Sequence, residues 1–506
     1  MPTPAIPSIP VLTPAQAGAF EAALLGGDES REWKAMLRAA RAVADAAARD
    51  MGEIGGFPGA GRILALAGKG NNAGDALLAA KEFLERFPKA TCDVLFAFGS
   101  RGLKPLAARA WRGLSESGRG RVRSVGASDL ARSYDLCLDG IFGFQYRPPL
   151  PSEARSAIEA SSRRKIRFRA AVDLPTGWSE PGAFLADFTY ATGTVKVPIL
   201  SCPNAGRPRY LDLGFYDGAK EARKSEGDQV VLASILGPLA GLRPAASDKR
   251  SQGHLVLVGG SEGLPGAILM ASLAALRSGV GLVTAFVPDS LAAAYAARVP
   301  EVMWAGLPET KGGGLAPAGL AKIRKALGRA SALAIGPGMG KDPKTHALVL
   351  DIVNGAKVPI VIDADALQPD IVRAGKAPRV LTPHAGEYAR ISGGAELRKL
   401  CTALGASIVL KGPVTRISDG GAVYHCFFGG PVLSRGGSGD ILAGIAGGLL
   451  AQAPGDPLAA ACRAAVWHGM AADQLARSKG QTAVRTLQLL DFLAPALRES
   501  AACPAS

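Results

Sequence analysis

The sequence predicts an α/β protein of two domains, each built on a mostly parallel, doubly wound sheet. Both halves alternate short apolar runs with helical stretches rich in Ala and Leu, which is the pattern of consecutive βαβ units. A chain of 506 residues has room for two to four domains of roughly 100–200 residues each. A polar, charged segment at residues 216–228 interrupts the apolar pattern. We therefore place the two domains at residues 1–224 and 225–506.

The expected elements of the first half follow from short apolar runs. Residues 62–67 form an apolar run that predicts a strand, and residues 74–87 predict the helix that follows it. Further strands are expected at residues 92–98, 134–138, 170–174 and 189–197.

The second half repeats this pattern after the polar segment. Strands are expected at residues 254–258, 281–287, 332–335, 359–362 and 407–410. Helices are expected at residues 266–278, from 439 to about 452 and from about 458 to 474.

The chain is basic, with a formal net charge of +15. Most of the charge is scattered, which favours an Arg-rich surface over a nucleic-acid groove. The one dense run consists of Arg163, Arg164, Lys165, Arg167 and Arg169. It leads into an apolar strand and has no aromatic residues among its charges, so a solvated helix end fits it better. We expect no nucleic-acid partner.

The cysteines and the apolar runs indicate a cytoplasmic protein. The 7 cysteines show no CxxC spacing, and Cys92 and Cys137 lie in strand-like runs, as buried thiols of a reducing compartment do. The N-terminal segment has neither the basic nor the apolar region of a signal peptide. No apolar run reaches the length of about 18 residues that a membrane span needs, so we expect no membrane partner.

The segment Gly436-Gly437-Ser438-Gly439-Asp440, followed by an apolar helical run, is the strongest chemical signal. Glycines let backbone N–H groups approach a phosphate, and the helix start adds free donors and a positive dipole end. Asp440 in the first turn can take a proton from a substrate hydroxyl. The alternative is a Gly-rich turn in which Ser438 caps the helix and Asp440 only favours its dipole.

Four further loops follow predicted strands and therefore meet at the same sheet edge, where open α/β sheets bind ligands. Their sequences are AIGPGMG, VIDADAL, LTPHAGE and IVLKGPVT. In the second loop, Asp363 and Asp365 either help to bind Mg²⁺ or phosphate or serve only as turn residues.

These segments, taken in order over residues 247–473, resemble the ribokinase-like NAD(P)H-hydrate dehydratase family. The family phosphorylates the C6 hydroxyl of the hydrate with ADP or ATP, which we expect to bind with Mg²⁺, and then eliminates phosphate. The resemblance implies that Asp440 is the base of the first step. It implies hydrate contacts at Ala267, Gly338, His384 and Asp440, and nucleotide contacts at Lys411, Gly412, Pro413, Val414, Thr415 and Gly439.

In the first half, the strand at residues 62–67 is followed by the segment GKGNNAGD. This fits the loose dinucleotide pattern GxGxxA, so a NAD-dependent oxidoreductase is a competing interpretation. The two Asn residues and Asp75 fit that interpretation less well, because polar side chains there would contact a sugar, an ion or a base.

The same segment resembles the GNNGGDG signature of the NAD(P)H-hydrate epimerase family, of Rossmann-like three-layer fold. LDGIFG and VDLPTG, at residues 138–143 and 172–177, resemble two further segments of that family. The resemblance implies K⁺ ligands at Asn72, Asp139 and Thr176, whose oxygens suit a hard monovalent cation. It makes Asp173 the acid/base for epimerisation at C6. It implies hydrate contacts at Asn71, Asn72, Ala73, Gly74, Asp75, Gly143, Phe144, Gln145, Tyr146, Arg147, Pro148, Pro149 and Asp173.

The first half also departs from the epimerase pattern. Ala73 and Ala76 replace glycines, GFQYR stands where the family has small residues, and MLRAA at residues 36–40 lacks an acidic residue and a glycine. Epimerisation is therefore expected to be weakened.

The leading hypothesis is a bifunctional repair enzyme that acts on hydrated NAD(P)H and forms a homo-oligomer. One alternative keeps the dehydratase with a first half that only binds a ligand. The other is a ribokinase-like kinase for a vitamin precursor.

Overall fold

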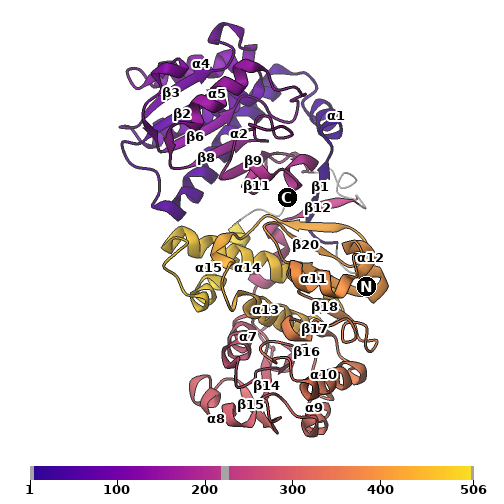
Figure 1. The fold of residues 1–506 in the computed structure, drawn as a ribbon. Coiled ribbons are helices and arrows are strands. Elements are labelled where there is room, and N and C mark those ends of the chain that lie inside the picture. Colours follow the sequence, from indigo (N-terminus) through magenta and orange to yellow (C-terminus); the bar gives the residue numbers. More distant parts are fainter. Residues whose placement is uncertain (1–4, 218–226, 503–506) are drawn as a thin grey trace. The chain divides into compact units, whose positions relative to one another are not determined.

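The computed structural model describes residues 5–217 and 227–502, which form two compact units. Among the described residues, one unit comprises residues 9–217 with 476–480, and the other comprises residues 5–8, 227–475 and 481–502. Residues 5–8 thus group with the C-terminal unit, whereas the predicted boundary at residue 224 lies outside the described residues. Figure 1 labels the elements, and each unit is considered by itself.

The N-terminal unit contains a sheet of seven strands in the order β11-β9-β8-β6-β2-β3-β4, and all neighbours run parallel. The strands are β2 (Arg62–Ala67), β3 (Thr91–Phe96), β4 (Val122–Ser124), β6 (Leu136–Gly140), β8 (Arg169–Val172), β9 (Phe188–Thr192) and β11 (Arg207–Leu211). Two short strands, β1 (Ser8–Leu12) and β10 (Val195–Lys196), pair in parallel beside it.

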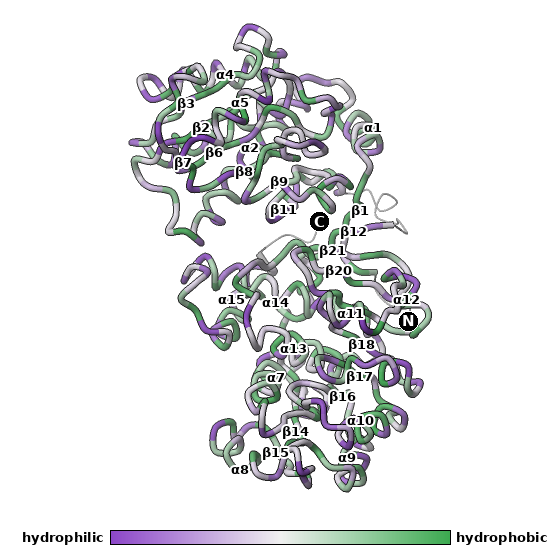
Figure 2. Tube along the Cα trace, in the orientation of Figure 1, coloured by the Kyte–Doolittle hydropathy of each residue, from purple (hydrophilic) through white to green (hydrophobic). Residues whose placement is uncertain are grey.

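Helices cover both faces of this sheet. They are α1 (Pro14–Leu25), α2 (Glu29–Asp50), α3 (Asn71–Arg86), α4 (Pro105–Ser117) and α5 (Ser152–Ser162). One hydrophobic cluster joins α2, α3 and α4 to the sheet, and a second includes Ala154, Ala157 and Ile158 of α5. The strands accordingly appear as hydrophobic stretches inside the unit in Figure 2. This is the three-layer arrangement that the sequence predicted.

The C-terminal unit has strands in the order β12-β21-β20-β19-β18-β17-β16-β13-β14-β15. From β19 to β15 all neighbours run parallel, and β20 is antiparallel to β19 and β21. The strands are β12 (Asp228–Val231), β13 (His254–Val258), β14 (Leu282–Pro288), β15 (Met303–Leu307), β16 (Ala332–Ile335), β17 (Ile360–Ile362), β18 (Arg379–Leu381), β19 (Ala406–Leu410), β20 (Thr415–Ser418) and β21 (Val423–Cys426).

Two helices that start at the carboxyl edge of this sheet pack tightly against each other. These are α7 (Pro265–Arg277) and α13 (Ser438–Gln452). A Cβ added to Gly444 would lie 2.1 Å from the Ala271 carbonyl oxygen, and one added to Gly448 would lie 1.8 Å from Ser278 Oγ. Glycine is therefore required on α13 for the close approach that positions its N-terminus.

The remaining helices complete the layers of the C-terminal unit. They are α6 (Gly237–Ala240), α8 (Asp289–Arg298), α9 (Leu320–Leu327), α10 (Pro343–Gly355), α11 (Ala385–Ser392), α12 (Leu397–Leu404), α14 (Pro457–Lys479) and α15 (Leu493–Ala502). No helix among the described residues is long and apolar enough to cross a membrane.

One expected element is wrong. Residues 189–197 were predicted to form one strand, but they form β9 and β10, which are separated at Gly193 with φ 69°. Positive φ breaks an extended strand, and the apolar character of both pieces hid this break. The basic run after α5 is confirmed as solvated, because Arg163, Lys165 and Arg167 are exposed.

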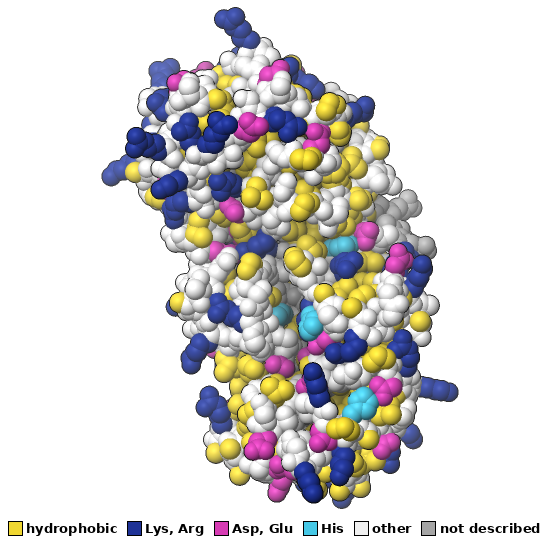
Figure 3. Space-filling model, in the orientation of Figure 1, with side chains coloured by type: hydrophobic (Ala, Val, Ile, Leu, Met, Phe, Trp, Pro, Cys, Tyr) yellow, Lys and Arg dark blue, Asp and Glu magenta, His cyan; other side chains and the backbone are white. Residues whose placement is uncertain are grey.

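Charge and cysteines also agree with the sequence analysis. Figure 3 shows Lys and Arg side chains spread over the visible face and mixed with Asp and Glu. The six described cysteines are free thiols, and all but the half-buried Cys202 are buried. Cys503 lies outside the described residues.

Candidate active sites

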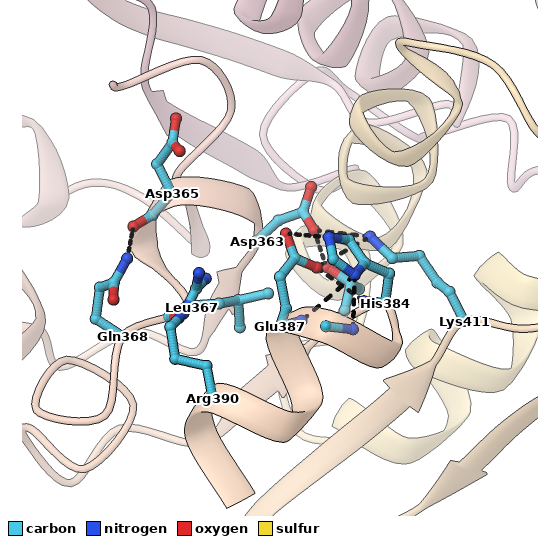
Figure 4. A network of polar contacts seen from close by, with 10 residues as sticks. Asp363, Asp365, Leu367, Gln368, His384, Glu387, Arg390 and Lys411 are labelled. Atoms are coloured by element: carbon cyan, nitrogen blue, oxygen red, sulfur yellow. Dashed lines mark hydrogen bonds and ion pairs between the residues drawn. The ribbon is translucent and has the colours of Figure 1, made fainter. Parts of the chain in front are cut away.

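Loops that follow four neighbouring strands form the candidate site of the C-terminal unit. Gly338 follows β16, Asp363 follows β17, His384 follows β18 and Lys411 follows β19. Asp440 lies in the first turn of α13. Figure 4 shows Asp363, His384, Glu387 and Lys411 pointing toward one another. The structure therefore brings the chemical groups of the predicted loops to one edge of the sheet.

Lys411 lies at the centre of this group. Its Nζ is 3.4 Å from Asp363 Oδ1 and 3.8 Å from Glu387 Oε2. A Cβ added to Gly439 would lie 3.3 Å from the same Nζ, which places the ammonium beside the GGSGD loop. Asp363 is further held by the Thr382 hydroxyl, which donates to its Oδ1 at 2.7 Å. The lysine thus faces the place where the helix start offers free N–H groups.

Asp440 differs from an ordinary aspartate in its proton affinity. Burial raises the pKa of its carboxyl to about 7, with a further increase from the negative charge of Asp363. Lys411 opposes this effect, while Asp365 and Glu387 add to it. A carboxyl with a pKa near neutrality suits a general base, because it is ionised at working pH yet binds a proton well.

His384 is the N-cap of α11. Its ring Nδ1 accepts hydrogen bonds from the backbone N–H groups of Gly386, at 3.0 Å, and Glu387, at 3.3 Å. In return, Glu387 Oε2 accepts a hydrogen bond from the backbone N–H of His384. A neutral histidine whose Nδ1 accepts carries its proton on Nε2. His384 therefore presents a hydrogen-bond donor, and not a base, to a ligand.

Ala267 and Gly338 lie side by side. Gly338 has φ +65°, and a Cβ there would lie 2.8 Å from Ala267 Cβ and 2.5 Å from the Leu264 carbonyl oxygen. The loop after β16 therefore requires glycine to lie against the start of α7. Gly412, Pro413 and Val414 lie in the connection from β19 to β20, which begins at Thr415, and Gly412 and Pro413 are exposed.

The candidate site of the N-terminal unit is a pocket of about 340 Å³. It lies beside the turn between β2 and α3 and is closed in part by the loop after β6. The predicted hydrate contacts that line it are Asn71, Asn72, Asp75, Gly143, Phe144, Gln145, Tyr146 and Asp173. The same pocket is lined by Glu21 and Lys196.

Asp173 has a strained backbone. Its φ is 68°, and the Leu174 N–H donates to the Val172 carbonyl at 2.9 Å, so Asp173 is the centre of a classic γ-turn. Its Oδ1 is 2.6 Å from Lys196 Nζ, and its Oδ2 accepts the Phe144 N–H at 2.7 Å. Such strain persists where the surroundings fix a functional side chain.

Asp139 and Thr176 form a buried polar cluster beside the pocket. Asp139 Oδ1 accepts the Thr176 hydroxyl, and its Oδ2 accepts the Thr176 N–H, both at 2.7 Å. Burial raises the pKa of Asp139 to about 6, and the hydrogen bonds from Thr176 oppose it. Among the described residues no cationic side chain pairs with this carboxyl, and Asn72 Nδ2 is buried without a hydrogen-bond partner.

Comparison with known proteins decides what these two sites belong to. The chain is 34% identical over 471 residues to the bifunctional NAD(P)H-hydrate repair enzyme Nnr of Moorella thermoacetica, which covers 86% of this chain and 87% of that protein. The corresponding Gloeobacter violaceus enzyme is 35% identical over 518 residues and covers 95% and 97%. The chain belongs to the family of bifunctional NAD(P)H-hydrate repair enzymes.

Two family descriptions match the two halves of this repair enzyme. NAD(P)H-hydrate dehydratase matches residues 255–495, and YjeF-related protein N-terminus matches residues 33–198. The solved structure of the ADP/ATP-dependent NAD(P)H-hydrate dehydratase from Bacillus subtilis, co-crystallized with ATP/Mg²⁺, is 29% identical with a TM-score of 0.45. The similarity covers 51% of this chain and 94% of the Bacillus subtilis chain. The predicted resemblance is confirmed, and the vitamin-precursor kinase alternative is wrong.

Several predicted contacts of the epimerase half do not line its pocket in this structure. They are Ala73, Gly74, Arg147, Pro148 and Pro149. Ala73 and Ala76 are completely buried in α3, where their helical backbone needs no glycine. Leu37 of the altered α2 segment is exposed and Ala40 is in the core. Ala73 and Ala76 therefore lie behind the pocket, whereas Met36 and Ala39 of the altered α2 segment line it together with Phe144 and Tyr146.

Sequence reasoning missed three polar residues of the repair enzyme's sites. Lys196 is 1% exposed and pairs with Asp173, and Glu21 is 3.5 Å from the same Nζ. Glu387 caps α11 and also faces Lys411. A lysine that ends an apolar strand was a usable signal, since lysine is almost never fully buried unless it is paired.

Proposed function

We propose that Asp440 takes the proton of the C6 hydroxyl when the dehydratase half phosphorylates S-NAD(P)HX with ATP or ADP. The supporting observation is a carboxyl with a pKa near neutrality at the N-terminus of α13, beside Lys411 and the GGSGD loop. The hydroxyl oxygen then attacks the terminal phosphorus, and the nucleotide leaves. Phosphate subsequently leaves C6 while a proton leaves the neighbouring ring carbon, which restores NAD(P)H.

The other residues of this site bind and orient the reactants. The Lys411 ammonium and the free N–H groups at Gly439 balance the charge of the transferred phosphoryl group, a role of positioning and electrostatics. His384 donates its Nε2 proton to an oxygen of the hydrate. Ala267 and Gly338 form the wall against which the hydrate lies.

A bound Mg²⁺ fits this site when it arrives with the nucleotide. Asp363, Asp365, Glu387 and Asp440 together outnumber the single cation Lys411, so a divalent ion would balance charge. No group of three or more Asp, Glu, His or Cys side chains among the described residues is arranged as a metal site. Mg²⁺ typically binds through one or two carboxylates plus nucleotide phosphates, and Asp363 and Asp365 are the candidates here.

In the epimerase half, we propose that Asp173 is the acid/base at C6 and that K⁺ binds at Asn72, Asp139 and Thr176. The residues fit the ion, because Asp139 is a fully buried carboxyl with no cationic partner among the described residues. K⁺ would supply the missing positive charge and hold the loops on either side of the pocket. A cytoplasmic location and a homo-oligomeric state stay predictions.

The proposed function is tested with purified protein and pure epimers. S-NAD(P)HX with ADP or ATP should yield NAD(P)H and inorganic phosphate, and R-NAD(P)HX should yield NAD(P)H more slowly through epimerisation. Accumulation of a phosphorylated hydrate without release of phosphate would contradict the dehydratase assignment.

Nucleotide binding should depend on Lys411. Lys411→Ala is expected to weaken ADP or ATP affinity by about tenfold or more, because it removes a cation near the phosphates. Hydrate affinity should change little. Calorimetric titration with each ligand separately checks this, with Lys399→Ala as control, since Lys399 is exposed and pairs with Glu396 on the surface. Equal nucleotide affinity of both variants would remove Lys411 from the site.

The dehydratase rate should follow the ionisation of Asp440. A base must be deprotonated, so kcat/KM for S-hydrate is expected to rise with pH through about 7 and then level off. The Lys411→Ala variant should show this rise at higher pH, because Lys411 lowers the pKa of Asp440. Initial rates in overlapping buffers measure both profiles, and a flat wild-type profile would contradict the assignment of the base.

A further inference from the structure

Epimerisation at C6 requires two proton transfers. The C6 hydroxyl leaves as water only if it gains a proton, and a water that adds to the opposite face must lose one. Two groups of different protonation state perform such a reaction most simply, one as acid and one as base. Asp173 accounts for one of them.

Three carboxyl groups of the epimerase pocket lie around the Lys196 ammonium. Asp75 comes from α3, Glu21 from α1, and Asp173 from the turn after β8, and all three line the pocket with Lys196. Lys196 Nζ is 2.6 Å from Asp173 and 3.5 Å from Glu21. Lys196 alone does not balance these three carboxylates, so their mutual repulsion favours a proton on at least one of them.

The three carboxyl groups differ in their partners. Asp173 accepts hydrogen bonds from Lys196 Nζ and from the Phe144 N–H. Glu21 accepts the Thr194 hydroxyl at 2.8 Å and faces Lys196. Asp75 has no hydrogen bond or ion pair to a described residue. Burial raises the pKa of Asp75 well above its usual value, Asp173 and Glu21 raise it further, and Lys196 opposes them.

We propose that Asp75 is the general acid of the epimerase half and that Asp173 is its base. This inference rests on the proposed function of Asp173. In the R-to-S direction the Asp75 proton passes to the C6 hydroxyl, and the C6–O bond breaks with both electrons leaving on water. The lone pair of the ring nitrogen forms a C6=N1 bond. Water then adds to the other face, the C6=N1 electrons return to nitrogen, and Asp173 takes the surplus proton.

This division of roles makes the reaction reversible without another reactant. After one turnover Asp75 is ionised and Asp173 is protonated, which is the arrangement that the S-to-R direction needs. Lys196 stabilises the Asp173 anion and is a positioning residue. Glu32, Lys69 and Lys104 also line the pocket, so their charges act on Asp75 in addition to those of Asp173, Glu21 and Lys196.

The test compares variants of the full chain in R-hydrate conversion at constant K⁺, with the spontaneous rate subtracted. Asp75→Asn cannot donate the proton and should lower the rate by about a hundredfold or more, whereas Asp75→Glu should retain part of it. Glu85→Gln is the matched control, because Glu85 is on the same helix and pairs with Lys81 at the surface. Dehydration of S-hydrate by each variant shows that the C-terminal half, which the assay requires, is equally active in all of them.

The pH profile separates an acid from a structural residue. The wild-type rate with R-hydrate should fall as the pH rises through the pKa of Asp75. Glu21→Gln removes a negative neighbour, so this fall should move to lower pH. If the rate falls at the same pH in Glu21→Gln as in the wild type, or if the Asp75→Asn rate is within about threefold of the wild-type rate, the proposed role of Asp75 is overturned. If the wild type itself shows no epimerisation above background, it is the proposed function that fails.

Discussion

Replacing Asp440 by Asn is expected to lower the turnover of S-hydrate by about a hundredfold or more, the size of effect that loss of a general base produces. The amide keeps the shape of the side chain but cannot accept the hydroxyl proton. Because Asp440 lies in the first turn of α13 and asparagine has the same shape, the fold and nucleotide binding should persist. The absorbance of reduced nicotinamide, followed with S-hydrate and ADP or ATP, measures the effect directly.

The matched control for this variant is Asp351→Asn, which changes an exposed carboxylate on α10. It should leave the rate unchanged. Nucleotide affinity, measured by calorimetry, should be similar in Asp440→Asn and wild type, since the cation Lys411 remains. Near-wild-type turnover of Asp440→Asn would exclude this residue from the mechanism and would leave its raised pKa as a consequence of burial alone.

Asp173→Ala is expected to abolish epimerisation, and the wild-type epimerisation itself should be weakened and K⁺-dependent. The variant removes the proposed base at C6. The wild type should be slow because Phe144 and Tyr146 alter the wall of the pocket, and a misplacement of about 1 Å can cost on the order of a hundredfold in rate. Conversion of pure R-hydrate by the full chain in K⁺ and Na⁺ buffers, less the spontaneous rate, measures both effects.

Because the backbone of Asp173 has a positive φ, a second substitution is needed beside Asp173→Ala. Alanine at φ 68° is strained, and Lys196 loses its buried partner, so Asp173→Ala also destabilises the N-terminal unit. Asp173→Asn tolerates the left-handed backbone better and should be equally inactive. Asp45→Asn, on the surface of α2, is the control that should remain active. If the wild type consumes R-hydrate only at the spontaneous rate but dehydrates S-hydrate normally, this result would favour the alternative in which the N-terminal half only binds a ligand.

The sequence predicted most elements because each half is built from buried parallel strands. Such strands are short, continuous apolar runs, and glycine-rich turns delimit them; residues 254–258 and 332–335 coincide with β13 and β16. The carboxyl ends of these strands share one edge, so the loops with Gly338, Asp363, His384 and Lys411 could be placed together before any contact was known. Residues 189–197 were predicted wrongly because β-branched residues continue on both sides of Gly193, and a single glycine can also lie inside a strand.

The sequence by itself determined the family and the two sheets. It also determined which residues lie at the strand ends and helix starts that face a ligand. These depend on local patterns and on the direction of parallel strands. Only the tertiary structure decided how those residues act on one another. The pairing of Lys196 with Asp173, the grouping of Asp75, Glu21 and Asp173 around Lys196, and the pKa of about 7 at Asp440 arise between segments far apart in the chain. Charge interactions depend on distance and burial in space, and neither quantity is contained in the order of the residues.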